Sequence, residues 1–275
     1  MGKLDGKVAF ITGAGRGQGR SHAVGFAREG ADIIAVDTTA KVESVPYALA
    51  DADDLAETAR LVEATGRRIV ARDADVRDYA ALAAAVSDGV NAFGRLDIVV
   101  ANAGISSPAP TLEMSEDTWQ DMIDINLTGV WKTLKSAVPH VIDGGRGGAV
   151  VITSSLAAVH SNENTAHYSA SKAGLVALMK VLAKELAPHS IRVNTVHPST
   201  VATPMILNDA TYRLFRPDLE NPTRADFEEA ARTLNRLPVA AVEPEDITDT
   251  VLHLVSDAAR YVTGTTQMVD AGGAL

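Results

Sequence analysis

Short apolar runs rich in β-branched residues recur along the chain, and longer stretches of helical character separate them. Within each run the apolar residues are continuous rather than alternating, which is typical of strands buried on both faces of a parallel sheet. This alternation of strand and helix predicts a doubly wound, Rossmann-like α/β fold with a parallel sheet. The expected strands are 8–12, 33–36, 69–71, 98–101, 150–153, 191–196 and 268–269, and the expected helices are 21–29, 55–64, 79–93, 116–138, 168–186 and 244–255.

Two irregular segments interrupt this alternation without suggesting a second domain, so residues 1–275 are expected to form a single domain. Residues 39–54 form an insertion that separates the second strand from its helix by more than the usual short connection. Residues 199–235 combine several prolines with large apolar residues such as Met205 and Phe215. We expect this second segment to be a lid over the substrate, and an ordinary surface excursion is the alternative.

The composition is that of a globular protein and argues against several kinds of partner. Hydrophobic residues make up 46% of the chain and charged residues 22%, which is ample for a core. A formal net charge of -10, with no dense tract of lysine or arginine, argues against nucleic acid. The lack of cysteine excludes disulfides and thiolate zinc sites, and no metal site is expected. No apolar run resembles a signal peptide or a membrane span, so a cytoplasmic location is expected.

A glycine-rich turn, Thr12-Gly-Ala-Gly-Arg-Gly-Gln-Gly19, follows the first expected strand and leads into the first helix. It does not satisfy the pattern Gly-x-Gly-x-x-Gly, because Arg20 stands where the third glycine would be, but it does satisfy Thr-Gly-x-x-x-Gly-x-Gly. Such a turn lets the backbone approach a pyrophosphate and aims a helix N-terminus at its negative charge. The residues expected to contact a dinucleotide here are Gly13, Arg16, Gly17, Gln18 and Gly19.

Asp37 closes the second expected strand, about two dozen residues beyond Gly13, where an acidic residue meets the adenosine ribose in such folds. Its carboxylate would accept hydrogen bonds from the ribose hydroxyls and repel a 2′-phosphate, and Thr38 offers no cation for such a phosphate. NAD is therefore favoured over NADP, although Arg16 in the glycine turn leaves NADP open. A plain helix-capping role is the alternative for Asp37.

Tyr168 and Lys172 stand four residues apart in an expected helix, so their side chains share one face. A free tyrosine has a pKa of roughly 10 and is a poor base at neutral pH. A neighbouring ammonium group favours the phenolate, so we expect Lys172 to lower the pKa of Tyr168 and make it a general acid/base. Taken alone, the spacing is also compatible with a chance surface pair.

These motifs, in this order and over essentially the whole chain, resemble the short-chain dehydrogenase/reductase family. The resemblance rests on the glycine turn, Asn102-Ala-Gly104, Asn126, Ser155 and the segment from Tyr168 to Lys172. It implies that Asp75 and Val76 flank the adenine and that Val201 and Thr203 approach the nicotinamide carboxamide. It also implies that Asn102, Ala103 and Gly104 support the fourth strand beside the cofactor.

The resemblance implies hydride transfer between a carbinol carbon and the nicotinamide, with Tyr168 as the acid/base. Ser155 would bind the substrate oxygen, Lys172 would hold the nicotinamide ribose, and Asn126 would retain a water that links Lys172 to solvent. Ser154 is an equally reactive hydroxyl, and only the family spacing selects Ser155. The chain departs from the family pattern after Pro198, where Ser199 replaces the usual glycine.

Within the family, the chain is most similar to the carveol dehydrogenase type, which is often described as mycofactocin-coupled. The segments 17–22, 119–123 and 196–198 and the insertion carry this likeness. It implies a tightly held NAD that an external redox carrier reoxidises in place, a secondary alcohol or ketone of terpenoid character as substrate, and a homotetramer.

Two rival functions use the same fold. One is a non-catalytic NAD-binding redox sensor or scaffold, and the other is an enoyl or imine reductase. The intact set of Asn126, Ser155, Tyr168 and Lys172 favours an alcohol dehydrogenase, because a pure binding module needs no positioned proton relay.

Overall fold

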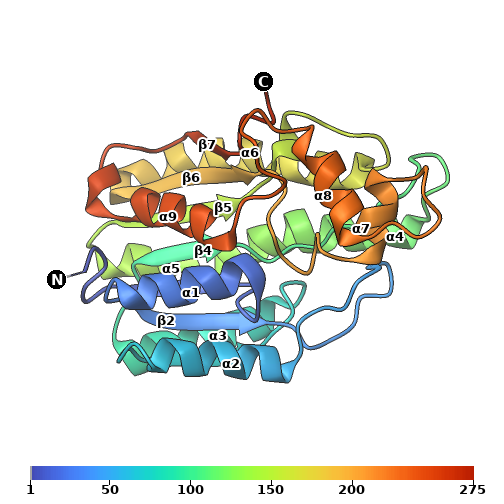
Figure 1. Ribbon diagram of the computed structural model, residues 1–275. Coiled ribbons are helices and arrows are strands. Elements are labelled where there is room, and N and C mark those ends of the chain that lie inside the picture. Colours follow the sequence, from blue (N-terminus) through green and yellow to red (C-terminus); the bar gives the residue numbers. More distant parts are fainter. Residues whose placement is uncertain (1) are drawn as a thin grey trace.

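The computed structural model describes residues 2–275 and consists of a parallel sheet with helices on both faces (Figure 1). The seven strands follow the order β3-β2-β1-β4-β5-β6-β7, and every neighbouring pair is parallel. The doubly wound fold expected from the sequence is therefore confirmed. The strands are β1 (Val8–Thr12), β2 (Asp32–Asp37), β3 (Ile69–Asp73), β4 (Ile98–Ala101), β5 (Gly148–Thr153), β6 (Ile191–Pro198) and β7 (Thr266–Val269).

The helices form two layers, each with its own hydrophobic core. One core joins the sheet to α1 (Gly17–Arg28), α2 (Ala52–Glu63) and α9 (Pro244–Val255). The other joins it to α3 (Tyr79–Phe93), α5 (Gly129–Gly144) and α6 (Ala166–Leu186). The central strands are buried on both faces, whereas the edge strands β3 and β7 are partly exposed. Within residues 2–275, no helix combines the length and the apolar character needed to cross a bilayer.

The helix expected over 116–138 is not continuous. The structure has α4 (Glu116–Ile123), a π-helical turn η1 (Asp124–Thr128), and then α5, which runs on past the expected end. A π turn adds a residue to the helical repeat, and such turns occur mostly at functional sites. The hydrophobic periodicity does not reveal it, because the chain stays helical on either side.

The two irregular segments occupy the same end of the sheet, beyond the carboxyl ends of the strands (Figure 1). The insertion is shorter than expected, because Asp51 caps α2 by accepting the Asp54 N–H at 2.9 Å, so the link from β2 covers residues 38–51. Residues 199–235 contain α7 (Asp209–Phe215) and α8 (Arg224–Arg232). These helices pack through Phe227, which is fully buried against Tyr212 and Phe215.

The chain winds outward from β1 in both directions, since β2 and β4 pair with opposite edges of β1. At such a switch point the connections leave a crevice at the carboxyl ends of the strands, where ligands bind in open α/β sheets. The cavity described next lies at this point.

Candidate active site

The glycine turn is shaped by close contacts that exclude side chains. A Cβ on Gly19 would lie 1.9 Å from the carbonyl oxygen of Gly13, and a Cβ on Gly13 would lie 2.8 Å from the Cα of Ala103. Gly13 also has a φ of 68°, in the left-handed region that favours glycine. The turn therefore packs directly on α1 and on the segment that follows β4.

Helix α1 begins at Gly17 with no side-chain cap and no acidic residue in its first turn. Its first N–H groups are consequently available to an anion, and the helix dipole favours negative charge there. Thr12 holds the segment that follows β4 beside the glycine turn, because its hydroxyl accepts hydrogen bonds from the N–H groups of Asn102 and Ala103, both at 3.1 Å. This arrangement fits the pyrophosphate of a dinucleotide.

Asp37 lies at the end of β2 and faces the same cavity. Its carboxylate accepts the Gly15 N–H at 2.7 Å and the Thr38 N–H at 2.8 Å. Burial raises the pKa of Asp37, while these backbone bonds and the Arg16 guanidinium act in the opposite direction. The bonds fix the carboxylate at the rim of the cavity, where it can accept ribose hydroxyls. It caps no helix, because Asp51 performs that role for α2.

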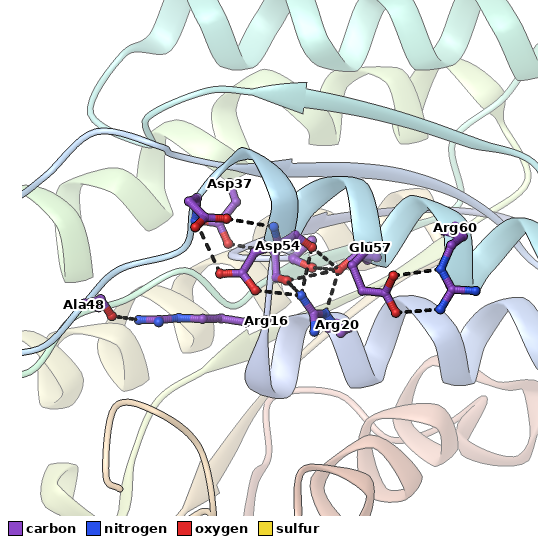
Figure 2. A network of polar contacts seen from close by, with 11 residues as sticks. Arg16, Arg20, Asp37, Ala48, Asp54, Glu57 and Arg60 are labelled. Carbon is purple, nitrogen blue, oxygen red and sulfur yellow. Dashed lines mark hydrogen bonds and ion pairs between the residues drawn. The ribbon is translucent and has the colours of Figure 1, made fainter. Parts of the chain in front are cut away.

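Figure 2 shows how Arg16 and Asp37 lie relative to the insertion. The Arg16 guanidinium donates to the carbonyl oxygen of Ala48, so it is engaged by the insertion. Neighbouring Arg20 pairs instead with Asp54 of α2, at 3.0 Å. Arg16 thus links the glycine turn to the insertion, and Arg20 links α1 to α2.

Residues 38–51, which we call the strap, form one wall of the cavity. Val42, Tyr47, Leu49 and Ala50 line it together with residues of the glycine turn. The Tyr47 hydroxyl accepts the Ser106 N–H at 3.0 Å, so the strap reaches the loop that follows β4. Burial raises the pKa of Tyr47 to about 12, which keeps this hydroxyl protonated.

Most of the residues assigned to the cofactor lie together in this cavity. A second cleft adjoins it and shares Gln18, Asn102, Gly104 and Thr203 with it. Gly19 does not line either cavity, and it packs closely on Gly13. Cavity-lining residues from the assigned set are Gly13, Arg16, Gly17, Asp37, Asp75, Val76 and Ala103, and Val201 lines the second cleft.

The second cleft brings Ser155, Tyr168 and Lys172 together. Ser155 follows β5, and Tyr168 lies in the first turns of α6, where the Ser155 hydroxyl opposes the rise that burial causes in the Tyr168 pKa. The Lys172 ammonium lies 5.6 Å from the centre of the Tyr168 ring and donates to the carbonyl oxygen of Thr153 at 2.9 Å. A serine hydroxyl, a phenol and an ammonium group thus face one space beside the cavity, and can orient an alcohol and move its proton.

That Lys172 lowers the pKa of Tyr168 stays a prediction. Burial raises the pKa of Tyr168, and the Ser155 hydroxyl opposes that rise. Burial also lowers the pKa of Lys172 to about 8. Desolvation of the charged form is the largest cause of each shift, because both groups are removed from water.

The two neighbouring serines differ in the groups that their hydroxyls bind. The Ser154 hydroxyl donates to the main-chain oxygen of Lys172 at 2.9 Å and is buried, so it fastens β5 to α6. The Ser155 hydroxyl accepts the Ala157 N–H at 3.1 Å and meets Tyr168. Ser155 is therefore the serine whose hydroxyl is placed to bind a reacting oxygen.

Asn126 lies in the π turn η1, and its side-chain amide is fully used. It accepts the Ile105 N–H at 2.8 Å, donates to the Ile105 carbonyl oxygen at 2.9 Å, and contacts the Met122 sulfur at 3.0 Å. A Cβ on Gly104 would lie 3.2 Å from Asn126 Oδ1 and 3.4 Å from Lys172 Nζ, so all three residues meet at one point. The side chain holds the loop after β4, and the water that Asn126 was expected to retain stays a prediction.

His197 is a positioning residue to which the sequence analysis assigned no role. It is buried in β6, where its Nδ1 donates to the carbonyl oxygen of Ser155 at 2.8 Å and its Nε2 lies 2.9 Å from the Thr195 hydroxyl. Because a carbonyl only accepts, Nδ1 carries the proton and Nε2 accepts from Thr195. In the sequence it stands within segment 196–198, which carries the likeness to the carveol dehydrogenase type.

Comparisons with known proteins agree with this geometry. A family model described as short chain dehydrogenase matches residues 7–211. The (-)-trans-carveol dehydrogenase of Rhodococcus erythropolis is 54% identical over 276 residues, covering 100% of both chains. The crystal structure of carveol dehydrogenase from Mycobacterium avium in complex with NAD is 54% identical, with a TM-score of 0.98 over 99% of each chain.

A second solved structure, a short chain dehydrogenase from Mycobacterium paratuberculosis bound to NAD, is 47% identical with a TM-score of 0.91 over 99% of each chain. These likenesses extend over the strap and over residues 199–235 as well as over the sheet. The chain therefore belongs to the short-chain dehydrogenase family, and within that family it is similar over its full length to carveol dehydrogenase.

Proposed function

We propose that the protein is an NAD-dependent oxidoreductase that interconverts a secondary alcohol and its ketone, with terpenoid alcohols of the carveol kind as the substrate class. The observation that carries this proposal is that Ser155, Tyr168 and Lys172 line one cleft, and that this cleft adjoins the dinucleotide cavity. The carveol dehydrogenases among its relatives, one of them solved with NAD, support the same substrate and cofactor.

Each side chain has a separate task in this proposal. NAD, when bound, supplies the nicotinamide carbon that accepts the hydride. Ser155 donates a hydrogen bond to the substrate oxygen, and Tyr168 takes the hydroxyl proton during oxidation or returns it during reduction. The Lys172 ammonium lies near the Tyr168 ring and donates to the Thr153 carbonyl oxygen. From there it can bind a ribose hydroxyl and stabilise the negative charge of the Tyr168 phenolate.

The proposal is tested by product analysis with a secondary terpenoid alcohol. The ketone and the reduced nicotinamide should form in equal amounts. An enoyl or imine reductase would leave this alcohol unchanged and consume reduced cofactor with an unsaturated substrate instead. A redox sensor would bind NAD and produce neither product.

We further propose that the strap shuts NAD in and that a separate redox carrier of the mycofactocin type reoxidises it in place. Apolar side chains of the strap line the cavity, and Arg16 and Ser106 bind its backbone and Tyr47. Burial of this kind slows dissociation more than association, since affinity differences between related complexes lie mainly in the off-rate. Alcohol oxidation should then stop after one turnover until an artificial electron acceptor is added.

Shortening the strap should release the cofactor. We expect NAD to copurify with the parent protein and to survive exhaustive dialysis. Replacing residues 43–49 with a short glycine-serine link should remove most of it, whereas the exposed single change Glu43→Gln should not. Bound nucleotide is measured after denaturation, and equal retention in the parent and the shortened protein would rule out the strap as a clamp.

Cofactor choice should depend on Asp37. The double change Asp37→Ala with Thr38→Arg removes the repulsive carboxylate and adds a guanidinium, so the preference for NAD over NADP should narrow or reverse. Asp73→Asn is the matched control, because it removes an exposed carboxylate from the end of the neighbouring strand β3. Paired titrations measure the ratio, and a parent that binds NADP as well as NAD would contradict the role of Asp37.

A cytoplasmic homotetramer completes the proposal. Exposed apolar side chains are available for contacts between copies, among them Trp119, Trp131 and Tyr261. The native mass of the protein in solution measures the number of copies.

A further inference from the structure

Ser44 joins the strap to α4, a helix that lines neither cavity. Its hydroxyl donates to Asp121 Oδ2 at 2.8 Å, and Figure 1 shows the strap extending from β2 toward this helix. Asp121 belongs to segment 119–123, which carries the likeness to the carveol dehydrogenase type and has no part in the catalytic set. The two residues are 77 positions apart in the chain, so the bond is a tertiary contact and not a local turn.

The other oxygen of Asp121 is connected to the wall of the cofactor cavity. Arg77 Nη1 lies 3.2 Å from Asp121 Oδ1. Arg77 also donates from Nη2 to Asp75 Oδ2 at 2.7 Å and from its backbone N–H to Asp75 Oδ1 at 2.8 Å. Asp75 lines the cofactor cavity. A chain of charge-assisted bonds therefore runs from the strap through α4 to the cavity wall.

The bond at Ser44 also fixes an apolar part of the same cavity. Ser44 lies in a tight turn of the strap, in which the Val45 N–H donates to the Val42 carbonyl oxygen at 3.1 Å. Val42 is buried and lines the cavity, so holding this turn in place holds that part of the wall. Arg16 and Ser106 bind the later part of the strap, and Ser44 adds a separate tie to its earlier part.

We propose that Ser44 and Asp121 form a latch that keeps the strap over the cavity and slows the departure of the dinucleotide. This inference rests on the proposed clamp. A dinucleotide enclosed by the strap leaves only when the strap moves aside, and that movement breaks the bond between Ser44 and Asp121. Neither side chain lines a cavity, so both are positioning residues that act through the strap.

The test measures the dissociation of NAD and not turnover. NAD-loaded protein is placed in a large excess of isotopically labelled NAD, and the unlabelled nucleotide that remains bound is quantified over time by mass spectrometry. Ser44→Ala should speed its loss about tenfold, the effect expected when one hydrogen bond to a charged group is removed. Ser44→Thr keeps a hydroxyl and should stay near the parent rate, as should Glu43→Gln at the neighbouring exposed position.

A second variant tests the other half of the latch. Asp121→Ala should speed the loss of NAD to a similar extent, whereas Asp117→Ala, which removes an exposed carboxylate from the same helix, should not. If the two residues form one latch, the protein that carries both Ser44→Ala and Asp121→Ala should lose NAD no faster than the faster single variant. Two independent structural effects would instead multiply.

Two results would overturn the latch: exchange at the parent rate in Ser44→Ala, and rates that multiply in the double variant. The protein with the shortened strap distinguishes these results from failure of the clamp. If it loses NAD quickly while Ser44→Ala does not, the clamp stands and the latch is wrong. If the shortened protein and the parent exchange NAD equally, the clamp itself is wrong, and the latch with it.

Discussion

Replacing Tyr168 with phenylalanine should lower turnover about 10²- to 10⁴-fold, the usual range for loss of a general acid/base. The ring remains, so the packing around it and the binding of NAD should be kept. The variant removes the one hydroxyl that can exchange a proton with the substrate oxygen beside Ser155. Single-turnover rates and bound NAD are measured on the same preparation.

Tyr261→Phe is the matched control, because Tyr261 is 89% exposed and lies outside the site. It should retain the parent rate. Turnover at the parent rate in Tyr168→Phe would refute the mechanism, while loss of NAD together with activity would show that Tyr168 acts mainly in binding.

Ser155→Ala should lower turnover about 10²- to 10³-fold, as removal of a hydrogen-bond donor to a developing oxyanion does in other enzymes. Ser154→Ala should behave differently. It removes the bond to the main-chain oxygen of Lys172, so the free energy of unfolding should fall by about 1 kcal/mol while most of the turnover survives. Rates and denaturation midpoints of both variants are compared. A slower Ser154→Ala than Ser155→Ala would reverse the assignment of the two serines.

The sequence predicted the fold well because its evidence is local. Continuous apolar runs mark the buried strands, and the edge strands β3 and β7 are more exposed because each has a neighbouring strand on one side only. The glycine turn could be recognised for the same reason, since its glycine pattern lies within residues 12–19. The π turn at Asn126 has no such signal, because helical periodicity persists on both sides of it.

The electrostatics of the site could not be predicted, because they depend on burial. The spacing of Tyr168 and Lys172 places them on one face of α6, but it carries no information about the desolvation that shifts both pKa values. Likewise, Ser154 and Ser155 carry the same hydroxyl, and only their three-dimensional partners tell them apart. The support that His197 gives to Ser155 joins two strands and required the register between them.

Hydride transfer itself can be followed with a secondary terpenoid alcohol that is deuterated at the carbinol carbon. One turnover of the NAD-loaded protein should place the deuterium on the nicotinamide, so the reduced cofactor gains one mass unit over that formed from unlabelled alcohol. The ketone should carry no label at that carbon. Reduced cofactor without deuterium, or ketone formed while NAD stays oxidised, would contradict direct transfer between the alcohol and the nicotinamide.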